Sequence, residues 1–202
     1  MGVKNKLNGR RVFFTTIGLI IAIFFSLIFY NAIKTKYGTE KKYVMSLKDS
    51  NEFEFHELNE GVYVGSVSEN AITGSGTFYY FNGDTYKGDI VEEIKNGTGN
   101  LVLANGDSYS GGFEDGLKSG TGNIDWANGN KYEGEFSNDT LTGNGTYTYA
   151  DGASYTGSFV GGQRYGTGIF TYLDGSIYDG KWIDDQYSGT GTYTYPDGSV
   201  LE

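Results

Sequence analysis

The sequence of 202 residues contains no cysteine, one proline and one histidine. Without cysteine the chain forms no disulfide and offers no thiolate ligand to a metal. His56 is the single histidine, and one imidazole in a strand is typical of a solvated surface residue, because metal sites need several converging ligands. The absence of cysteine excludes a disulfide scaffold and a thiolate metal site, and it is compatible with a location outside the cytoplasm.

Positive charge is scarce in most of the chain. Residues 1–48 contain nine basic residues and one acidic residue, whereas residues 49–202 contain six basic and twenty-four acidic residues. The two parts therefore carry formal charges of +8 and −18, which give the net charge of −10. Such acidity argues against nucleic acid as a partner and against flat binding of the second part to an anionic membrane.

Glycine and tyrosine are abundant, with 33 and 18 residues, and they recur in six consecutive copies of a 23-residue unit. Each unit opens with tyrosine, has glycine two residues later, continues to a Gly-x-Gly pair and closes on Asn-Gly or Asp-Gly. The opening tyrosines are Tyr63, Tyr86, Tyr109, Tyr132, Tyr155 and Tyr178. Self-similarity at a fixed short period indicates stacked repeats that are stabilised by contacts between neighbouring units.

The residue types within one unit predict a β-hairpin. Between residues 132 and 151, large apolar residues are two or four positions apart and polar residues stand between them. A period of two is typical of strands with one apolar and one solvated face. Asn-Gly and Asp-Gly predict type I′ turns, in which both central residues have positive φ. Gly134, Gly143 and Gly145 are expected on the apolar face, where aromatic rings can lie over the backbone.

The order Tyr-x-Gly-x-Phe, short loop, Gly-x-Gly and Asx-Gly resembles the MORN repeat (membrane occupation and recognition nexus) over residues 63–200. The resemblance implies an all-β fold, an elongated, twisted, single-layer antiparallel sheet of stacked β-hairpins. The six repeats of the array 63–202 begin at residues 63, 86, 109, 132, 155 and 178. The resemblance also implies an adaptor, dimerisation module or membrane-linked organiser. The sequence departs from the family at the hairpin tips, where Glu93, Asp139 and Asp185 replace glycine.

Four segments precede the repeats: a basic tail (1–11), an uncharged run (12–33), a charged linker (34–51) and a capping strand for the first hairpin (52–62). The run 12–33 is long enough to cross a ~30 Å hydrocarbon layer as one helix. A cleaved signal peptide is the alternative, although no small-residue cleavage site is visible near residues 31–35. Basic residues are balanced on the two sides of the run, so charge alone does not decide its orientation. We expect an uncleaved single-pass anchor with the repeats outside the cytoplasm.

The glycine pairs and the acidic residues of the repeats do not meet the requirements of a nucleotide site or a metal site. The Gly-x-Gly pairs lack the third glycine and the helix start of a dinucleotide fingerprint. The carboxylates expected at the hairpin tips would lie about 10 Å apart along one edge, too sparse for the six to eight oxygens of a tight calcium site. We therefore expect no enzyme activity, no metal and no cofactor.

The aromatic residues of the apolar face are the candidate binding residues. Cross-strand packing is one role for each ring, but a sheet without a second layer leaves this face partly open, and an open aromatic surface marks a binding site. The candidates are Phe113, Trp126, Tyr132, Phe136, Tyr155, Phe159, Tyr178, Trp182 and Tyr195, and Tyr149 and Tyr172 share their face.

The sequence therefore predicts a non-enzymatic, membrane-anchored scaffold. We expect it to recognise a protein partner, or a second copy of itself, through the aromatic face or the sheet edges. A cell-surface module for glycan or cell-wall polymer is the alternative, because tyrosine and tryptophan stack on sugar rings. Lipid recognition by the repeats is a third hypothesis, which the family name suggests and the charge of −18 over residues 49–202 opposes.

Overall fold

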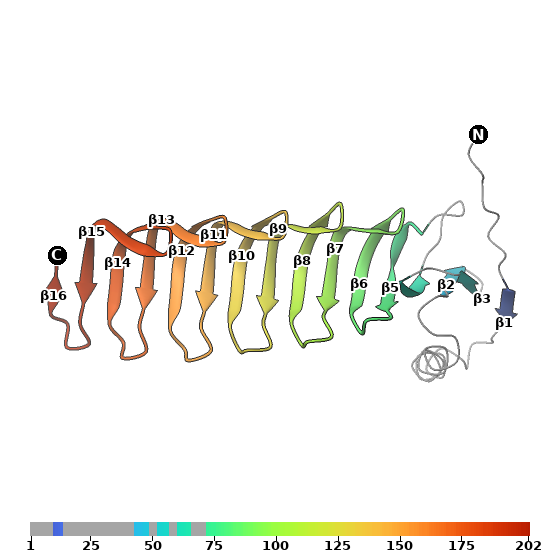
Figure 1. Ribbon diagram of the computed structural model, residues 1–202, viewed down its shortest axis with the longest axis horizontal. Helices are drawn as coiled ribbons and strands as arrows, with labels where there is room; N and C mark the ends of the chain where they lie inside the picture. Colours follow the sequence, from blue (N-terminus) through green and yellow to red (C-terminus); the bar gives the residue numbers. More distant parts are fainter. Residues whose placement is uncertain (1–9, 14–42, 49–51, 57–59, 66–71) are drawn as a thin grey trace. The chain divides into compact units, whose positions relative to one another are not determined.

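The structure is a computed structural model that describes residues 10–13, 43–48, 52–56, 60–65 and 72–202. Every regular element in these ranges is a β-strand, so the expected all-β class is confirmed for them (Figure 1). None of the described residues belongs to a helix long and apolar enough to cross a membrane. The chain divides into two compact units, residues 1–95 with 101–104 and residues 96–100 with 105–202.

The first unit begins with three strands that precede the repeats: β1 (Arg10–Phe13), β2 (Tyr43–Lys48) and β3 (Glu52–His56). The repeat strands that follow are β4 (Gly61–Gly65), β5 (Gly74–Tyr80) and β6 (Thr85–Val91), and β7 (Ile94–Val102) has residues in both units. β4, β5 and β6 pair antiparallel in chain order.

The capping strand differs from the expectation. β3 lies within the predicted cap 52–62, but it pairs with β1 and β2, and β2 is the strand that pairs with β4, in parallel. β2 comes from the expected linker, whose segment YVMSLK begins with the strand-favouring residues Tyr43 and Val44. β1 contains Val12 and Phe13, the first two residues of the expected membrane helix, while residues 14–33 lie outside the described residues.

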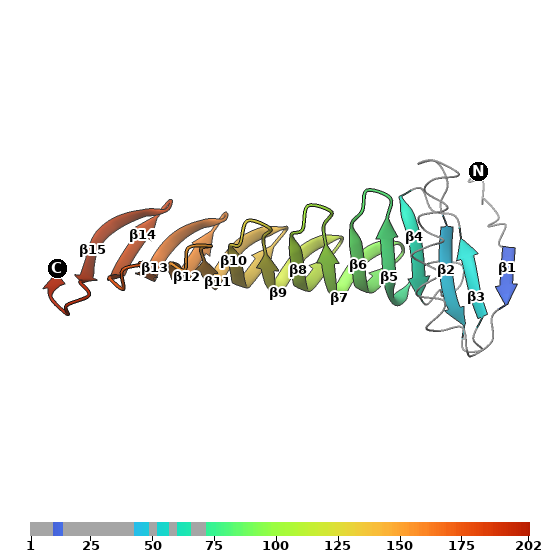
Figure 2. The same ribbon diagram turned by 90° about the horizontal axis from the view of Figure 1, so that it is seen from below.

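The second unit is a row of antiparallel strands in chain order. It comprises β8 (Ser108–Glu114), β9 (Leu117–Asp125), β10 (Lys131–Ser137), β11 (Thr140–Thr148), β12 (Ser154–Val160), β13 (Gln163–Thr171), β14 (Ile177–Ile183), β15 (Gln186–Thr194) and β16 (Val200–Leu201). Figure 2 shows that these strands twist progressively along the row. The expected antiparallel hairpin array is therefore confirmed in this unit.

Successive hairpins are joined by turns of two kinds, which lie at opposite ends of the strands. The tip turns are Glu92–Glu93, Asp115–Gly116, Asn138–Asp139, Gly161–Gly162 and Asp184–Asp185, and both residues of each have positive φ. Positive φ at two central residues is the geometry of a type I′ turn, whose twist matches that of the flanking strands. The type I′ turns therefore form at the tips.

The Asn-Gly and Asp-Gly turns lie along the lower edge of the second unit in Figure 1, and their predicted type I′ geometry is wrong. Between β11 and β12 the Gly152 amide donates to the Tyr149 carbonyl, at 2.9 Å, and only the glycine has positive φ. The loop has three residues, because the Tyr149 amide donates to the Ala153 carbonyl, also at 2.9 Å. The Asp151 carboxylate accepts from the Ala153 amide at 3.0 Å, an Asx turn that keeps Asp151 out of the left-handed region.

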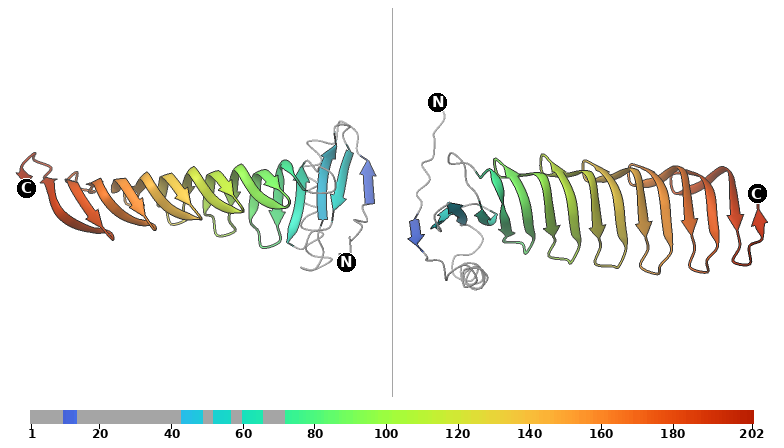
Figure 3. Two further views of the ribbon diagram at one scale, coloured as in Figure 1. Left: turned by 90° about the horizontal axis from the view of Figure 1, so that it is seen from above. Right: turned by 180° about the vertical axis from the view of Figure 1, so that it is seen from behind.

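A β-bulge interrupts β9, β11, β13 and β15 near the Gly-x-Gly pair of each strand. In β10–β11, Gly134 pairs with Gly145 but Glu135 pairs with Thr142, so two residues of β11 are extra. Gly143 is one of them, with φ of 56°, a left-handed conformation that glycine adopts without a steric penalty. A β-bulge bends its strand and increases the local twist. Figure 3 shows the resulting curvature of the second unit's strands from above and behind.

The glycines confirm one part of the predicted face and correct another. A Cβ at Gly134 or Gly145 would overlap the ring of Tyr132, so these two glycines lie beneath an aromatic ring as expected. A Cβ at Gly143 would instead meet the carboxylate of Glu135, which faces away from the aromatic rings. The placement of Gly143 on the apolar face was therefore wrong, because the bulge turns this residue to the other side.

Candidate binding surface

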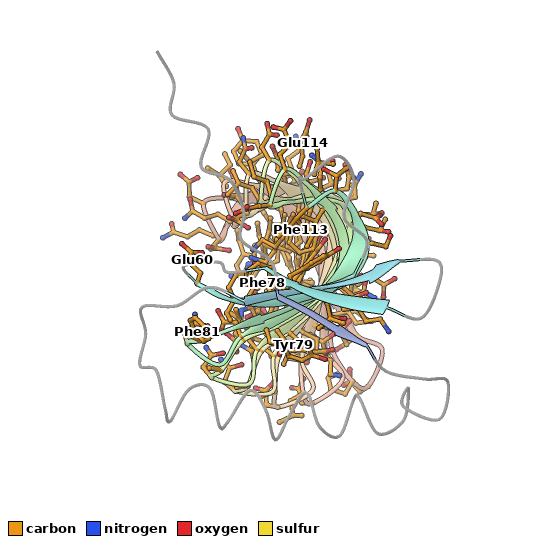
Figure 4. All side chains as sticks on the ribbon, turned by 90° about the vertical axis from the view of Figure 1, so that its right-hand side faces the viewer. Glu60, Phe78, Tyr79, Phe81, Phe113 and Glu114 are labelled. Carbon is orange, nitrogen blue, oxygen red and sulfur yellow. The ribbon has the colours of Figure 1, made fainter. Side chains whose placement is uncertain are left out.

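The curved strands enclose one row of rings completely. Figure 4 shows Phe113 pointing into the interior and its neighbour Glu114 pointing away. Seven of the nine candidate residues are buried in this way: Phe113, Tyr132, Phe136, Tyr155, Phe159, Tyr178 and Trp182. Their burial makes them the core of the second unit, so a partner cannot contact them without opening the sheet.

Edge-to-face contacts explain how a single layer buries these rings. The Tyr132 ring meets Phe136 of its own strand and Phe159 of the next repeat, both with centroids 5.2 Å apart and planes nearly perpendicular. The Tyr132 hydroxyl donates to the Glu135 carbonyl at 3.1 Å, and burial raises the pKa of Tyr132 to about 12. Tyr109, Tyr132 and Tyr155 each contact a ring of the following repeat in this way, and burial disfavours the ionised form of Tyr132.

Trp182 is also a core residue, although it lies in the last repeat of the array. It is 2% exposed, and its indole N–H donates to the Gly168 carbonyl at 3.0 Å. The rings of Tyr155, Tyr178 and Tyr187 surround it, with centroids 4.7 to 5.4 Å away. The indole therefore binds neighbouring strands together.

A second row of rings, here called the aromatic ladder, lies on the same face but nearer the Asx-Gly turns. Its members are Trp126, Tyr147, Tyr149, Phe170, Tyr172, Tyr193 and Tyr195. The first six are half-buried, and Tyr195 is 43% exposed. The ladder therefore presents accessible aromatic surface over a fixed core, and it retains two of the nine candidates, Trp126 and Tyr195.

Contacts between ladder rings are continuous from one repeat to the next. The centroid distances are 5.4 Å for Trp126–Tyr147, 4.7 Å for Tyr147–Tyr149, 5.8 Å for Tyr149–Phe170, 4.6 Å for Phe170–Tyr172, 5.7 Å for Tyr172–Tyr193 and 4.8 Å for Tyr193–Tyr195. The side-chain amide of Asn130 donates to the Tyr147 hydroxyl at 2.8 Å and fixes one ring further. Such a pre-ordered row loses little side-chain entropy when a partner binds.

Aspartates stand in or directly after the Asx-Gly turns, at the end of the strands where the ladder lies. The Ala127 amide, and then the Asn105 side chain, donate to Asp107 and lower the pKa of its carboxyl. The Ser176 amide lowers the pKa of Asp174, and the Ser199 hydroxyl followed by its amide lowers that of Asp197. These carboxylates are ionised at neutral pH, so the Asx-Gly turns at this end of the strands are negatively charged.

The tip turns contain ion pairs between neighbouring repeats that sequence reasoning missed. Asp139 accepts from the amide and the ammonium of Lys118, at 3.0 and 3.1 Å. Asp185 accepts in the same way from the amide and Nε of Arg164, at 3.0 and 2.9 Å. In the repeat between these two, Leu141 stands at the position of the basic residue, and Gly162 stands at the position of the aspartate in the next repeat. The Gly162 amide donates to the Leu141 carbonyl at 3.0 Å, so the hydrogen bond between repeats remains without the ion pair. A basic residue followed 21 positions later by aspartate is the signal that could have predicted these pairs.

Arg164 also contacts aromatic rings. Its guanidinium carbon lies 4.3 Å from the centroid of Trp182 and 5.4 Å from that of Phe170, a ladder ring. Such contacts are cation–π interactions. The guanidinium thus connects the tip turns to the core and to the ladder.

The acidic residues at the tips do not converge. Within the described ranges, no three histidine, cysteine or acidic side chains lie close enough together to hold a metal ion. Asp139 and Asp185 are engaged by cations of the preceding repeats. The tips thus act as connections between repeats.

Comparison with known proteins gives a family match and distant structural similarities. The MORN-repeat family profile matches residues 63–85, 109–131, 132–154, 155–177 and 178–200. Five of the six expected repeats are thereby confirmed. Residues 86–108 are outside these matches, although β6 and β7 within them are joined by a tip turn like the others. No curated protein sequence matches the chain.

Three solved structures are similar at low sequence identity. The TCP domain of SAS-4 (dCPAP) of Drosophila melanogaster, solved with a proline-rich motif of Ana2 (dSTIL), is 17% identical over 65% of this chain and 74% of that chain, with a TM-score of 0.41. The TCP10c domain of Drosophila melanogaster Sas-4 is 14% identical over 63% and 90%, with a TM-score of 0.34. The G-box domain of the microcephaly protein CPAP is 16% identical over 62% and 77%, with a TM-score of 0.32.

Proposed function

The chain belongs to the MORN-repeat family, and from this premise we propose that it is a non-catalytic scaffold whose aromatic ladder binds a protein partner. The observation that carries the proposal is the division of the apolar face into two rows of rings. One row is fully buried as the core, whereas the other is only half-buried, although its ring contacts are equally regular. Tyrosine and tryptophan are enriched at binding hot spots, where truncation of one side chain costs about 2 kcal/mol or more of binding free energy.

The ladder is a better candidate than the opposite face of the sheet. That face is polar for most of its length: threonines such as Thr146 and Thr156 face each other there and share a hydrogen bond of 3.0 Å. Its apolar residues, such as Ile169 and Ile177, are separated by threonine and aspartate neighbours across the strands. The opposite face of the second unit therefore lacks the continuous ring contacts between repeats that the ladder has.

The proposal is tested with the paired change Tyr149→Ser and Tyr172→Ser in the full chain. The matched control is Ile177→Ser, which removes an exposed apolar side chain from the opposite face. Proteins captured by the wild-type chain from membranes of the source cell should be lost with the ladder variant and retained with the control. Circular dichroism verifies that both variants are folded.

A glycan screen with the same three proteins tests the alternative partner. Binding to a polysaccharide that the ladder variant abolishes, without any captured protein, would replace the protein-scaffold proposal with a glycan-binding function. Capture that is indifferent to the ladder variant would move recognition to another surface.

We further propose that residues 14–33, the part of the uncharged run that follows β1, anchor the protein in a membrane and that the repeats lie outside the cytoplasm. The support is the uncharged run itself, most of which lies outside the described residues. Intact-mass measurement of the protein from membranes should show that residues 1–33 are retained. A mature form that begins near Lys34 would contradict the anchor, and protease protection in sealed vesicles would decide the orientation.

A further inference from the structure

We propose that the aromatic ladder binds an extended, basic polypeptide segment in the polyproline II conformation, with a lysine or arginine at every third residue. This inference rests on the proposed function, because it names the chemical class of partner for the same surface. Two independent features support it: the negative charge of the second unit and the distance between equivalent ladder rings of successive repeats.

The charge of the second unit selects a cationic partner. The unit contains fourteen acidic and four basic residues, a formal net charge of −10. Three of its four basic residues, Lys118, Lys131 and Arg164, already form ion pairs with aspartates. Excess carboxylates such as Asp174 and Asp197 stand two residues after a ladder tyrosine and remain ionised, because hydrogen bonds lower their pKa.

Aromatic rings beside carboxylates suit a cation better than a neutral apolar group. The ring face carries partial negative charge and attracts lysine or arginine, and a nearby carboxylate adds to that attraction. The molecule already contains one example: Arg164 lies over Trp182 while its Nε donates to Asp185. Along the ladder an aspartate follows a tyrosine by two residues at Tyr149 and Asp151, Tyr172 and Asp174, and Tyr195 and Asp197. The Asp151 carboxylate is near enough to Tyr149 to act on it electrostatically.

Spacing selects the conformation of the partner. Equivalent rings of successive repeats are two strands apart, or about 10 Å at the usual strand separation. A polyproline II helix has three residues per turn and a rise of about 3.1 Å, so it places every third side chain on one face at about 9.3 Å intervals. A β-strand covers a similar distance in three residues but turns the third side chain to the opposite face. A basic residue at every third position can therefore reach successive carboxylates of the ladder.

The test measures binding of labelled synthetic peptides to the full chain by fluorescence anisotropy. The matched peptide repeats Pro-Pro-Lys, and two control peptides change one property each. Pro-Pro-Glu repeats reverse the charge, and Pro-Lys repeats with the same number of lysines change the period to two. We expect Pro-Pro-Lys to bind at least tenfold more tightly than either control and to weaken as salt is raised.

Variants of the chain place the peptide on the ladder. Tyr149→Ser with Tyr172→Ser should weaken Pro-Pro-Lys binding at least tenfold. Asp174→Asn with Asp197→Asn should weaken it and reduce its salt dependence, whereas Asp179→Asn, on the opposite face of β14, should leave both unchanged. Equal effects of the two charge changes would show non-specific attraction and would overturn the inference.

The remaining outcomes separate this inference from the proposed function. Equal affinity for the two lysine peptides would overturn the period of three, and no binding would overturn the whole inference. In either case a natural partner captured in a ladder-dependent way would leave the scaffold proposal intact. If the ladder variant affects neither peptide nor captured partner, both proposals are overturned.

Discussion

Tyrosine occupies two environments in the last three repeats, and the environment decides its chemistry. Core tyrosines such as Tyr109 and Tyr132 lie over paired glycines, and burial raises the pKa of each to about 12. Ladder tyrosines such as Tyr193 are half-buried on the same face. The same residue type therefore stabilises the fold at one position and is available for binding at the other.

The raised pKa values of the core tyrosines predict alkaline unfolding. A tyrosine ionises near pH 10 in the unfolded chain, so folding favours the neutral phenol. The stabilisation from Tyr109 and Tyr132 is complete below pH 10 and is lost as the pH rises through about 12. Circular dichroism during alkaline titration should follow this loss, together with the absorbance of tyrosinate.

The variant Tyr132→Phe isolates one residue in this titration. It should move the alkaline midpoint upward, because one buried ionisable group is gone. At neutral pH it should cost about 1 kcal/mol, since the Glu135 carbonyl loses its donor. Tyr165→Phe, at an exposed ring, is the control and should change neither quantity. An unchanged midpoint for Tyr132→Phe would show that its ionisation does not limit stability.

Non-glycine residues in the tip turns make another residue-scale prediction. Glu92 and Glu93 have φ of 49° and 71°, and left-handed conformations cost an L-residue about 1–2 kcal/mol. Their amides donate to Thr73 and Ile72, bonds that do not depend on the glutamate side chains. Replacing the pair with Asn-Gly, which favours a type I′ turn, should therefore raise stability by about 1 kcal/mol in a denaturant titration.

Asp185→Gly provides the contrast to that prediction. Glycine again relieves a left-handed φ, of 66°, but the change removes the carboxylate that holds Arg164. We expect no net gain at this position. A stabilisation equal to that of the Asn-Gly pair would show that the contact with Arg164 contributes nothing.

At the scale of elements, the sequence predicted the hairpins correctly but assigned the type I′ geometry to the wrong turns. The Asx-Gly turns were expected to be type I′, whereas the tip turns have that geometry. Strand alternation around Tyr132 and the fixed period were sufficient for the register of the repeats, because each repeat buries the same face. The Asn-Gly and Asp-Gly dipeptides alone did not predict the turn type. In the turn between β11 and β12, the Asp151 carboxylate accepts a hydrogen bond from the Ala153 amide, which stabilises a three-residue loop instead. Glu92–Glu93 contains no turn signal, and its conformation is imposed by the strands on either side.

The candidate site was predicted in part for a similar reason. The alternation of apolar and polar residues correctly placed all the rings on one face. It gives no information about the β-bulges or about the bend that they introduce into the strands. That bend seals Phe136 and Phe159 while Trp126 and Tyr195 remain accessible. The sequence therefore indicated which face is aromatic, and only the structure separates its core from its surface.

The bulge glycines allow strain and steric conflict to be measured separately. Gly120 and Gly143 have φ of 70° and 56°, but a Cβ at Gly120 would meet nothing within 4 Å, whereas one at Gly143 would overlap Glu135. Gly120→Ala should cost about 1 kcal/mol for the left-handed conformation alone. Gly143→Ala should cost more, because Glu135 must move and its hydrogen bond from the Asn144 amide, at 2.9 Å, is lost. Equal losses in denaturant titrations would show that the Glu135 bond contributes nothing.

At the scale of the whole molecule, each repeat of the second unit is stabilised by its neighbours. Core rings such as Tyr132 and Tyr155 contact the phenylalanine or tryptophan of the following repeat. Stability in such an array is close to a sum of repeat and interface contributions. The position of a defect within the unit should therefore matter as much as its chemistry.

Two matched substitutions test this dependence on position. A Cβ at Gly145 would overlap the ring of Tyr132, and a Cβ at Gly191 would overlap that of Tyr178, so Gly→Ala has the same local effect at both. β11, which contains Gly145, is flanked by full-length strands on both sides, whereas β15, which contains Gly191, has on its outer side only the two-residue β16. Gly145→Ala should therefore lower the main thermal transition and increase hydrogen exchange from β9 to β13. Gly191→Ala should increase exchange only in β14–β16 and leave the main transition nearly unchanged. If the two variants melt alike, the second unit unfolds as one cooperative block, and coupling between neighbouring repeats does not limit how far a defect spreads.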